Sequence, residues 1–105
     1  MPGIDINYFV RQANKLTEKI EERKKSLADE TVEGKAGDGT VVVTATAAQE
    51  IRSIKIDPKL IDPADPALLE DLVTAAVNAA LTNSRDHMQK ELGKVSGGIK
   101  IPGLT

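Results

Sequence analysis

The chain offers few side chains that could carry out catalysis. His87 is its only histidine and it has no cysteine, so a Ser-His-Asp set would need Asp86 or a distant acid to orient the imidazole. Neighbouring helix residues point about 100° apart, which places Asp86 poorly for that role. A solvent-exposed helix histidine is the simpler interpretation. We therefore expect no catalytic residue, metal site, cofactor or small-molecule substrate.

Two further motifs resemble ligand sites only superficially. Residues 34–39, GKAGDG, lack the Gly-Lys-Ser/Thr ending of a phosphate-binding loop, and Asp38-Gly39 is a strong hairpin signal. The Asp-Pro pairs that begin at Asp57, Asp62 and Asp65 lack the ligand spacing and the glycine of an EF-hand loop. The sequence favours turns and helix caps at both places.

A row of basic residues near the N-terminus is the pattern that could bind a ligand. These residues are Arg11, Lys15, Lys19 and Arg23, followed by Lys24 and Lys25. Side chains four residues apart lie along one edge of a helix, where like charges repel by about a few tenths of a kcal/mol. Helix stability therefore does not explain the row. It would suit phosphate contact with duplex DNA, whereas the near absence of aromatic residues argues against base stacking. A solvated helix face is the alternative.

The remaining composition indicates one modest domain over residues 1–105. Aromatic residues make up 2% of the chain, so the core must consist of aliphatic side chains, and an oligomer that completes this core is favoured. No apolar run approaches the roughly 20 residues that a membrane span needs, and the N-terminus does not resemble a signal peptide. We expect a cytoplasmic protein with a flexible tail from about residue 97 to 105.

Hydrophobic periodicity predicts an α+β fold. A long helix from about Ile6 to Ala28, capped by Asp5, precedes three strands near residues 31–36, 40–46 and 50–57, which form an antiparallel meander. Ile51 and Ile54 are out of phase, which suggests a bulge at residues 52–53. A second long helix runs from Pro66 to about Val95, with Asp65 as its cap. Its second half either projects from the body or packs on the first helix.

The second helix is apolar or alanine on most faces between residues 68 and 81. A helix of this kind must be covered on most faces. The sheet covers one side, and we expect a partner subunit to cover another. The residues that we assign to this dimer interface are Leu69, Leu72, Val73, Ala76, Val77 and Ala80.

The order of these elements resembles the YbaB/EbfC nucleoid-associated proteins over nearly the whole chain. The most specific motifs are residues 56–58 (IDP) with Leu60, residues 69–73 (LEDLV) with the alanines and Asn78 that follow, and the VSGG ending at residues 95–98. The turn at residues 47–49 departs from the Asn-Gly type common in the family, and the second half of the second helix is only sparsely basic. The resemblance implies a small, cytoplasmic, dimeric protein with helical arms arranged like tweezers, and no known catalytic site.

The resemblance also implies a function, since family members bind, coat or bend DNA in the bacterial nucleoid. We expect a homodimer that binds duplex DNA with low sequence specificity and affects nucleoid organisation or gene expression. Besides the row on the first helix, the expected contacts on the second helix are Arg85, Lys90 and Lys94. The alternative is a dimeric scaffold whose arms grip another protein without direct DNA binding.

Overall fold

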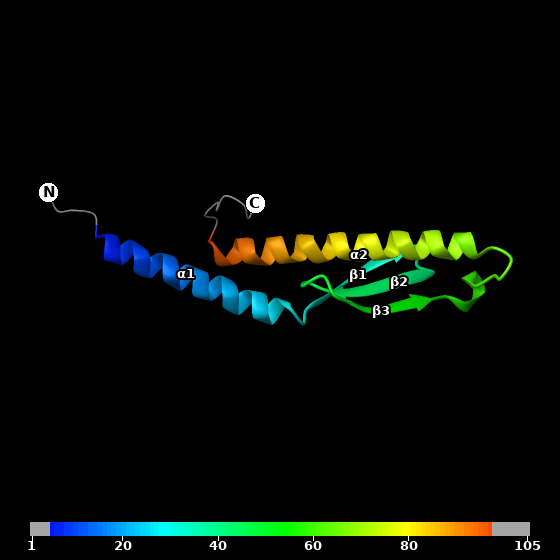
Figure 1. The fold of residues 1–105 in the computed structure, drawn as a ribbon, viewed down its shortest axis with the longest axis horizontal. Coiled ribbons are helices and arrows are strands. Elements are labelled where there is room, and N and C mark those ends of the chain that lie inside the picture. Colours follow the sequence, from blue (N-terminus) through cyan, green and yellow to red (C-terminus); the bar gives the residue numbers. More distant parts are fainter. Residues whose placement is uncertain (1–4, 98–105) are drawn as a thin grey trace.

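The computed structural model describes residues 5–97, which form two long helices and one small sheet. In chain order the elements are α1 (Ile6–Leu27), β1 (Thr31–Ala36), β2 (Val41–Thr46), β3 (Ile51–Ile56), the short 3-10 helix η1 (Pro58–Leu60) and α2 (Pro66–Val95). Figure 1 shows α2 lying along the sheet while α1 extends away from it. The predicted α+β fold is thus confirmed. Apart from Gly97, the expected tail lies outside the described residues.

Polar caps fix where the two helices begin, as the sequence predicts. The Tyr8 amide donates to Asp5 Oδ1 over 3.2 Å at the start of α1. The Leu68 amide donates to Asp65 Oδ1 over 3.3 Å at the start of α2, where Pro66 takes the first helical position. Each cap satisfies an amide that has no partner within its helix. No helix within residues 5–97 has an apolar stretch of the length needed to cross a membrane.

The sheet is an antiparallel meander in the order β1-β2-β3. Gly37, Asp38 and Gly39 all have positive φ in the first turn, which glycine adopts without steric cost. In the second hairpin Thr44 pairs with Ser53 and Ala45 with Ile51, so Arg52 is the extra residue of a bulge. This bulge places Ile51 and Ile54 on the same face of the sheet and explains their spacing.

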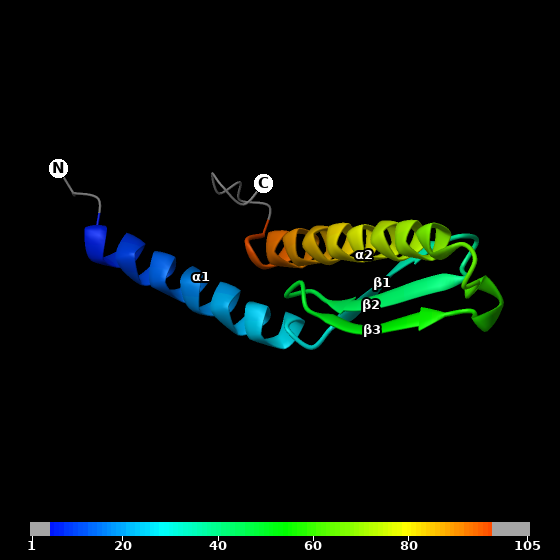
Figure 2. The same ribbon diagram turned by 45° about the vertical axis from the view of Figure 1, so that its right-hand side comes forward.

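The main core lies between α2 and the neighbouring strands β1 and β2 (Figure 2). Val41, Val43, Ala45, Ala76 and Ala80 are fully buried there. Gly34 makes the close approach possible, because a Cβ at this position would lie 2.7 Å from Ala80 Cα and closer still to backbone atoms of Ala80 and Ala76. The helix backbone therefore rests directly on β1.

A second, smaller core joins the end of α1 to the second half of α2. It contains Leu27, Ala47 and Leu92, with Ile20 and Met88 packed against them. The second half of α2 therefore packs on α1, which was one of the two predicted alternatives. This contact fixes the base of α1 and leaves its N-terminal half free to extend.

The turn between β2 and β3 is tied to α2 by a buried serine. Ser84 Oγ donates to the Thr46 carbonyl over 2.5 Å and accepts from the Gln49 amide over 3.2 Å. Gln49 has a φ of 65°, a conformation that costs a non-glycine residue some energy. The bond from Ser84 helps to hold this turn. It is the turn at residues 47–49, where the sequence departs from the Asn-Gly type common in the family.

Candidate nucleic-acid interface

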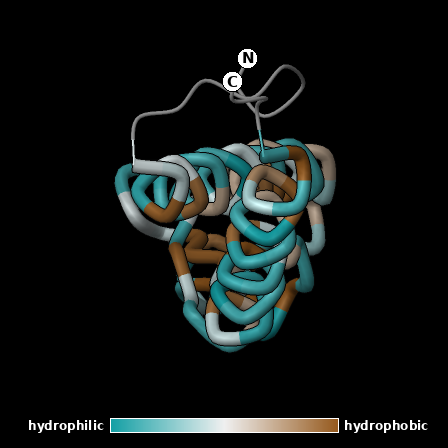
Figure 3. The backbone as a smooth tube through the Cα atoms, turned by 90° about the vertical axis from the view of Figure 1, so that its left-hand side faces the viewer, coloured by the Kyte–Doolittle hydropathy of each residue, from teal (hydrophilic) through white to brown (hydrophobic). Residues whose placement is uncertain are grey.

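The N-terminal half of α1 is an exposed arm. Ile6, Phe9 and Val10 are 72%, 58% and 50% exposed although they belong to the apolar stripe of the helix, and only Leu27 of α1 is fully buried. Figure 3, which views the molecule from this end, shows hydrophobic residues interleaved with hydrophilic ones along the projecting helix. The arm therefore presents both charged and apolar side chains to solvent.

The basic row of α1 winds around the helix instead of following one straight edge. Each step of four residues turns the row by about 40°, so Arg11 and Arg23 point about 120° apart. Arg11 is exposed and lies 4.0 Å from Asp5. Lys15 and Lys19 are exposed and border a groove of about 380 Å³ against Val95 at the point where α1 leaves α2. Arg23 faces α2.

Arg23 is occupied by acidic partners. Its Nη1 lies 2.7 Å from Glu30 Oε2 and its Nη2 lies 3.6 Å from Glu91 Oε2. The same Nη1 donates to Ser26 Oγ over 2.8 Å. The hydrogen bond to Glu30 raises the pKa of the Arg23 guanidinium. These contacts join α1 to the segment before β1 and to α2, so Arg23 connects elements of the chain where the sequence analysis expects a DNA contact.

The other residues expected to contact DNA differ in their exposure and in whether a carboxylate lies close to them. Within the described residues, Lys25 and Lys90 are exposed without a close carboxylate, whereas Lys24 lies 3.6 Å from Glu21. Arg85 is exposed and donates to Thr82 Oγ1 over 3.3 Å. Lys94 lies 3.1 Å from Glu91. The structure therefore gathers the most available cations on α1 and leaves α2 with a thinner set.

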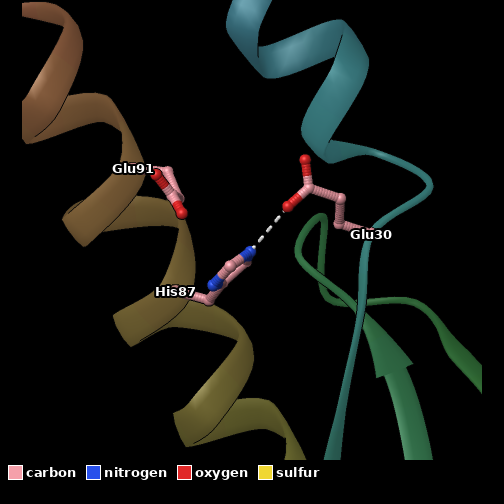
Figure 4. A group of neighbouring side chains, drawn as sticks. All are labelled: Glu30, His87 and Glu91. Carbon is pink, nitrogen blue, oxygen red and sulfur yellow. Dashed lines mark hydrogen bonds and ion pairs between the residues drawn. The ribbon is translucent and has the colours of Figure 1, made fainter.

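His87 differs from its expected state. Its Nε2 lies 3.0 Å from Glu30 Oε1 and its side chain is 27% exposed, so the prediction of a freely solvated histidine is wrong. Figure 4 shows Glu91 one turn further along α2, beside the same pair. Hydrogen bonds from His87 and then Arg23 lower the pKa of Glu30, and the bond from Lys94 lowers the pKa of Glu91.

Sequence reasoning missed this polar group because its members are far apart in the chain. Glu30 and His87 are separated by 57 residues, and Glu30 follows α1 in a short connection that carried no motif. The available signal was the spacing of His87 and Glu91, which places both on one face of a helix. Only the packing of α2 on α1 brings Glu30 and Arg23 to that face.

The residues expected at a dimer interface fall into two groups. Ala76 and Ala80 are fully buried against the sheet within one chain, so in this arrangement they present no surface to a partner. The close approach at Gly34, which the sequence pattern did not indicate, is the reason. The other four residues, Leu69, Leu72, Val73 and Val77, remain partly accessible.

Comparisons with known proteins agree with the architecture. The model of the YbaB/EbfC DNA-binding family matches residues 1–99. A nucleoid-associated protein of Myxococcus xanthus is 71% identical over 105 residues, which is 100% of both chains. A nucleoid-associated protein of Anaeromyxobacter dehalogenans is 48% identical over 102 residues, covering 97% of this chain and 99% of its own length.

A solved structure shares the fold. The crystal structure of an uncharacterized protein from Helicobacter pylori superposes with a TM-score of 0.74 at 16% sequence identity, covering 90% of this chain and 100% of the other. That likeness concerns the fold alone. The family match over residues 1–99 and the identity to nucleoid-associated proteins concern the sequence itself. The chain belongs to the YbaB/EbfC DNA-binding family, which is a family of DNA-binding proteins and not of enzymes.

Proposed function

We propose that this protein binds duplex DNA with low sequence specificity through the cations of α1. The observation that carries the proposal is the charge of α1, whose 22 residues include six bases and three acids, hence a net charge of +3, while the whole chain has a net charge of −2. Arg11, Lys15, Lys19 and Lys25 are exposed along it. A cationic helix of about 33 Å, whose N-terminal half projects from the body, is suited to a polyanion.

Low specificity follows from the kind of contact that these side chains make. Exposed lysines on an arm reach phosphate oxygens, which fix orientation but carry no sequence information. Neither Tyr8 nor Phe9 lies on a sheet or in a cleft that would stack single-stranded bases. We therefore propose binding along duplex DNA in the nucleoid of the cytoplasm, with effects on nucleoid organisation or gene expression that depend on coverage and not on one site.

We further propose that two chains form the binding unit. Ile54 lies on the sheet face that α2 covers, but α2 rests on β1 and β2, so Ile54 remains 44% exposed. Ile61 and Leu68 are 55% and 47% exposed at the same end of the molecule. A second copy that covers this apolar face, together with Leu69 and the neighbouring accessible residues of α2, would present two arms to DNA.

The dimer can be tested by the mass of the protein in solution. Ile54→Asp is expected to give a monomer in analytical ultracentrifugation, because it places a charge in the proposed interface. Val10→Asp on the arm is the matched control and is expected to remain a dimer. A wild-type protein that sediments as a monomer at micromolar concentrations would refute this part of the proposal.

A protein-binding scaffold is the second candidate. The observation that favours it is the apolar end of the arm, where Ile6, Phe9 and Val10 are at least half exposed, since such residues commonly mark contact surfaces for other proteins. In this alternative the cations of α1 only keep the arm soluble. DNA binding that is absent or insensitive to salt would favour the scaffold.

An electrophoretic mobility shift with charge-reversed variants separates the two candidates. Lys15→Glu/Lys19→Glu is expected to lose most of its affinity for a duplex DNA fragment, because both arms of the dimer lose contacts. The matched control is Lys35→Glu/Lys55→Glu, which makes the same charge change at exposed residues of β1 and β3, on the sheet face opposite Ile54 and away from α1 (Figure 1). If both variants lose affinity equally, or neither does, the arm is not the binding element.

A further inference from the structure

A group of side chains between the C-terminal end of α1 and the second half of α2 has the chemistry of a metal ligand set. Glu30, His87 and Glu91 each offer one ligand atom, and these three atoms lie within 4.8 Å of one another. Glu30 comes from the connection between α1 and β1, while the other two come from successive turns of α2 (Figure 4). We propose that this site binds a divalent transition-metal ion of the zinc class.

The geometry requires little movement to bind such an ion. Zinc is bound by imidazole nitrogen and carboxylate oxygen at about 2.0–2.2 Å, so two of its ligand atoms in a tetrahedral site are about 3.4 Å apart. His87 Nε2 and Glu30 Oε1 are already 3.0 Å apart. The Glu91 oxygen lies within 4.8 Å of the other two ligand atoms, so it must approach them by at most about 1.4 Å. Water would complete the coordination.

The spacing of the two helix residues supports this assignment. His87 and Glu91 are four positions apart and therefore project from the same face of α2, a spacing that zinc-binding helices also use. Glu91 is only 16% exposed, which is low for a glutamate. Glu30 is 39% exposed, and its bond to His87 Nε2 holds its carboxylate against the imidazole.

The surrounding cations leave a place for the ion. Arg23 contacts Oε2 of Glu30 and lies 3.6 Å from Oε2 of Glu91, whereas the imidazole faces Oε1 of Glu30. The guanidinium can therefore keep its position and orient Glu30 from behind, as outer partners of metal ligands commonly do. Lys94 is different, because it lies 3.1 Å from Oε2 of Glu91 and is 62% exposed. We expect the ion to displace Lys94 into solvent.

Such an ion would stabilise the contact between the C-terminal end of α1 and the second half of α2. The ligands join the segment that follows α1 to the second half of α2, next to the small core of Leu27 and Leu92. An ion held there would restrict the angle between the two helices. The inference does not depend on DNA binding, and its test uses the metal alone.

The composition of the chain makes the test specific. His87 is the only histidine and there is no cysteine, so zinc binding that depends on imidazole can be assigned to one residue. Isothermal titration of the full chain with Zn²⁺, in a buffer without chelating components, is expected to show one ion per chain. Binding of Co²⁺ should give the visible absorption of a site that includes nitrogen.

Variants distinguish a built site from general attraction to acidic residues. His87→Gln and Glu91→Gln are each expected to weaken zinc binding by about tenfold or more, since even outer partners of a metal commonly contribute 10- to 100-fold. Glu70→Gln, an exposed position on the same helix, is the matched control and should leave binding unchanged. Lys94→Gln is expected to tighten binding by about threefold because it removes the nearer of the two cations at the Glu91 carboxylate, while Lys90→Gln should not.

Circular dichroism establishes that each variant is folded before its titration is interpreted. The proposal is overturned if the wild-type chain shows no saturable binding of Zn²⁺ at millimolar concentrations. It is equally overturned if His87→Gln, folded as the wild type, binds the ion with undiminished affinity. In either case the group is an ion-pair network only.

Discussion

Replacing Gly34 with alanine is expected to push α2 away from the sheet. The added Cβ would lie 2.7 Å from Ala80 Cα and closer still to the Ala80 nitrogen and the Ala76 carbonyl oxygen. Carbon atoms in contact prefer about 3.5–4.0 Å, and the obstructing atoms belong to a helix backbone that cannot rotate aside. The helix must therefore shift by about 1 Å or more.

The cost of this shift follows from the packing that it disturbs. A gap of about 0.5–1 Å loses roughly a quarter to a half of the dispersion energy of each contact, and the contacts at risk are those of the main core, including Val43 and Ala76. Overpacked cores lose about 1–3 kcal/mol. Because backbone meets backbone here, we expect a loss near 3 kcal/mol, which lowers the melting temperature by about 12 °C or more.

Urea unfolding followed by far-UV circular dichroism measures this loss, at one fixed protein concentration because a dimer's stability depends on it. Gly93→Ala is the matched control, since a Cβ at Gly93 in α2 meets nothing within 4 Å. It is expected to stabilise the protein by about 1 kcal/mol, because glycine is a poor helix former. Equal stabilities for Gly34→Ala and the wild type would refute the close approach of α2 to β1.

Three further changes probe the polar contacts. Ser84→Ala is expected to cost about 0.5–1.5 kcal/mol in urea unfolding, because the Thr46 carbonyl and the Gln49 amide lose their bonds to Ser84 and keep only the bond to each other. Thr82→Ala, an exposed position, should change stability by less than about 0.5 kcal/mol. The pKa values of Glu30 and Glu91 lie below their ordinary 4.5, so their ion pairs stabilise the fold above that pH and the contribution is lost as pH falls through the lowered values. Thermal melts between pH 7 and pH 3 should therefore show a loss that Glu30→Gln/Glu91→Gln lacks, and an equal loss in this variant would contradict the assignment. Arg23→Gln is expected to leave the salt dependence of DNA binding nearly unchanged, because Arg23 is paired with Glu30 and Glu91, whereas Lys19→Gln is expected to lower it. If Arg23→Gln lowers the salt dependence as much as Lys19→Gln does, Arg23 contacts phosphate.

Local rules accounted for most of the fold. Asp5 and Asp65 act as helix caps, and the Gly-Asp-Gly turn joins β1 and β2. The three-residue spacing of Ile51 and Ile54, which breaks the alternation of a strand, arises from a bulge at Arg52. Each of these features depends on residues close together in the chain. Sequence patterns predicted them because side-chain spacing and backbone preference are local properties.

The arrangement of the helices was less accessible to sequence reasoning. Nothing in the pattern at Gly34 indicates that a helix backbone rests on it, and this contact is what buries Ala76 and Ala80 inside one chain. Likewise, the spacing of the basic residues from Arg11 to Arg23 predicts that they share one edge of the helix. Each step of four residues turns the side chain further around α1, so Arg23 faces Glu30 and Glu91. Long-range packing, and not residue type, decides which cations remain available.

The dependence of DNA affinity on salt tests the central claim most directly. In the proposed dimer, two arms present Arg11, Lys15, Lys19 and Lys25 twice, or about eight cations, so log K should fall against log salt with a slope near −7. Fluorescence anisotropy of a labelled duplex, titrated between about 50 and 200 mM salt, should therefore record a loss of affinity of about 10⁴-fold. A slope near zero, or a slope that Lys15→Gln/Lys19→Gln does not reduce, would contradict the account.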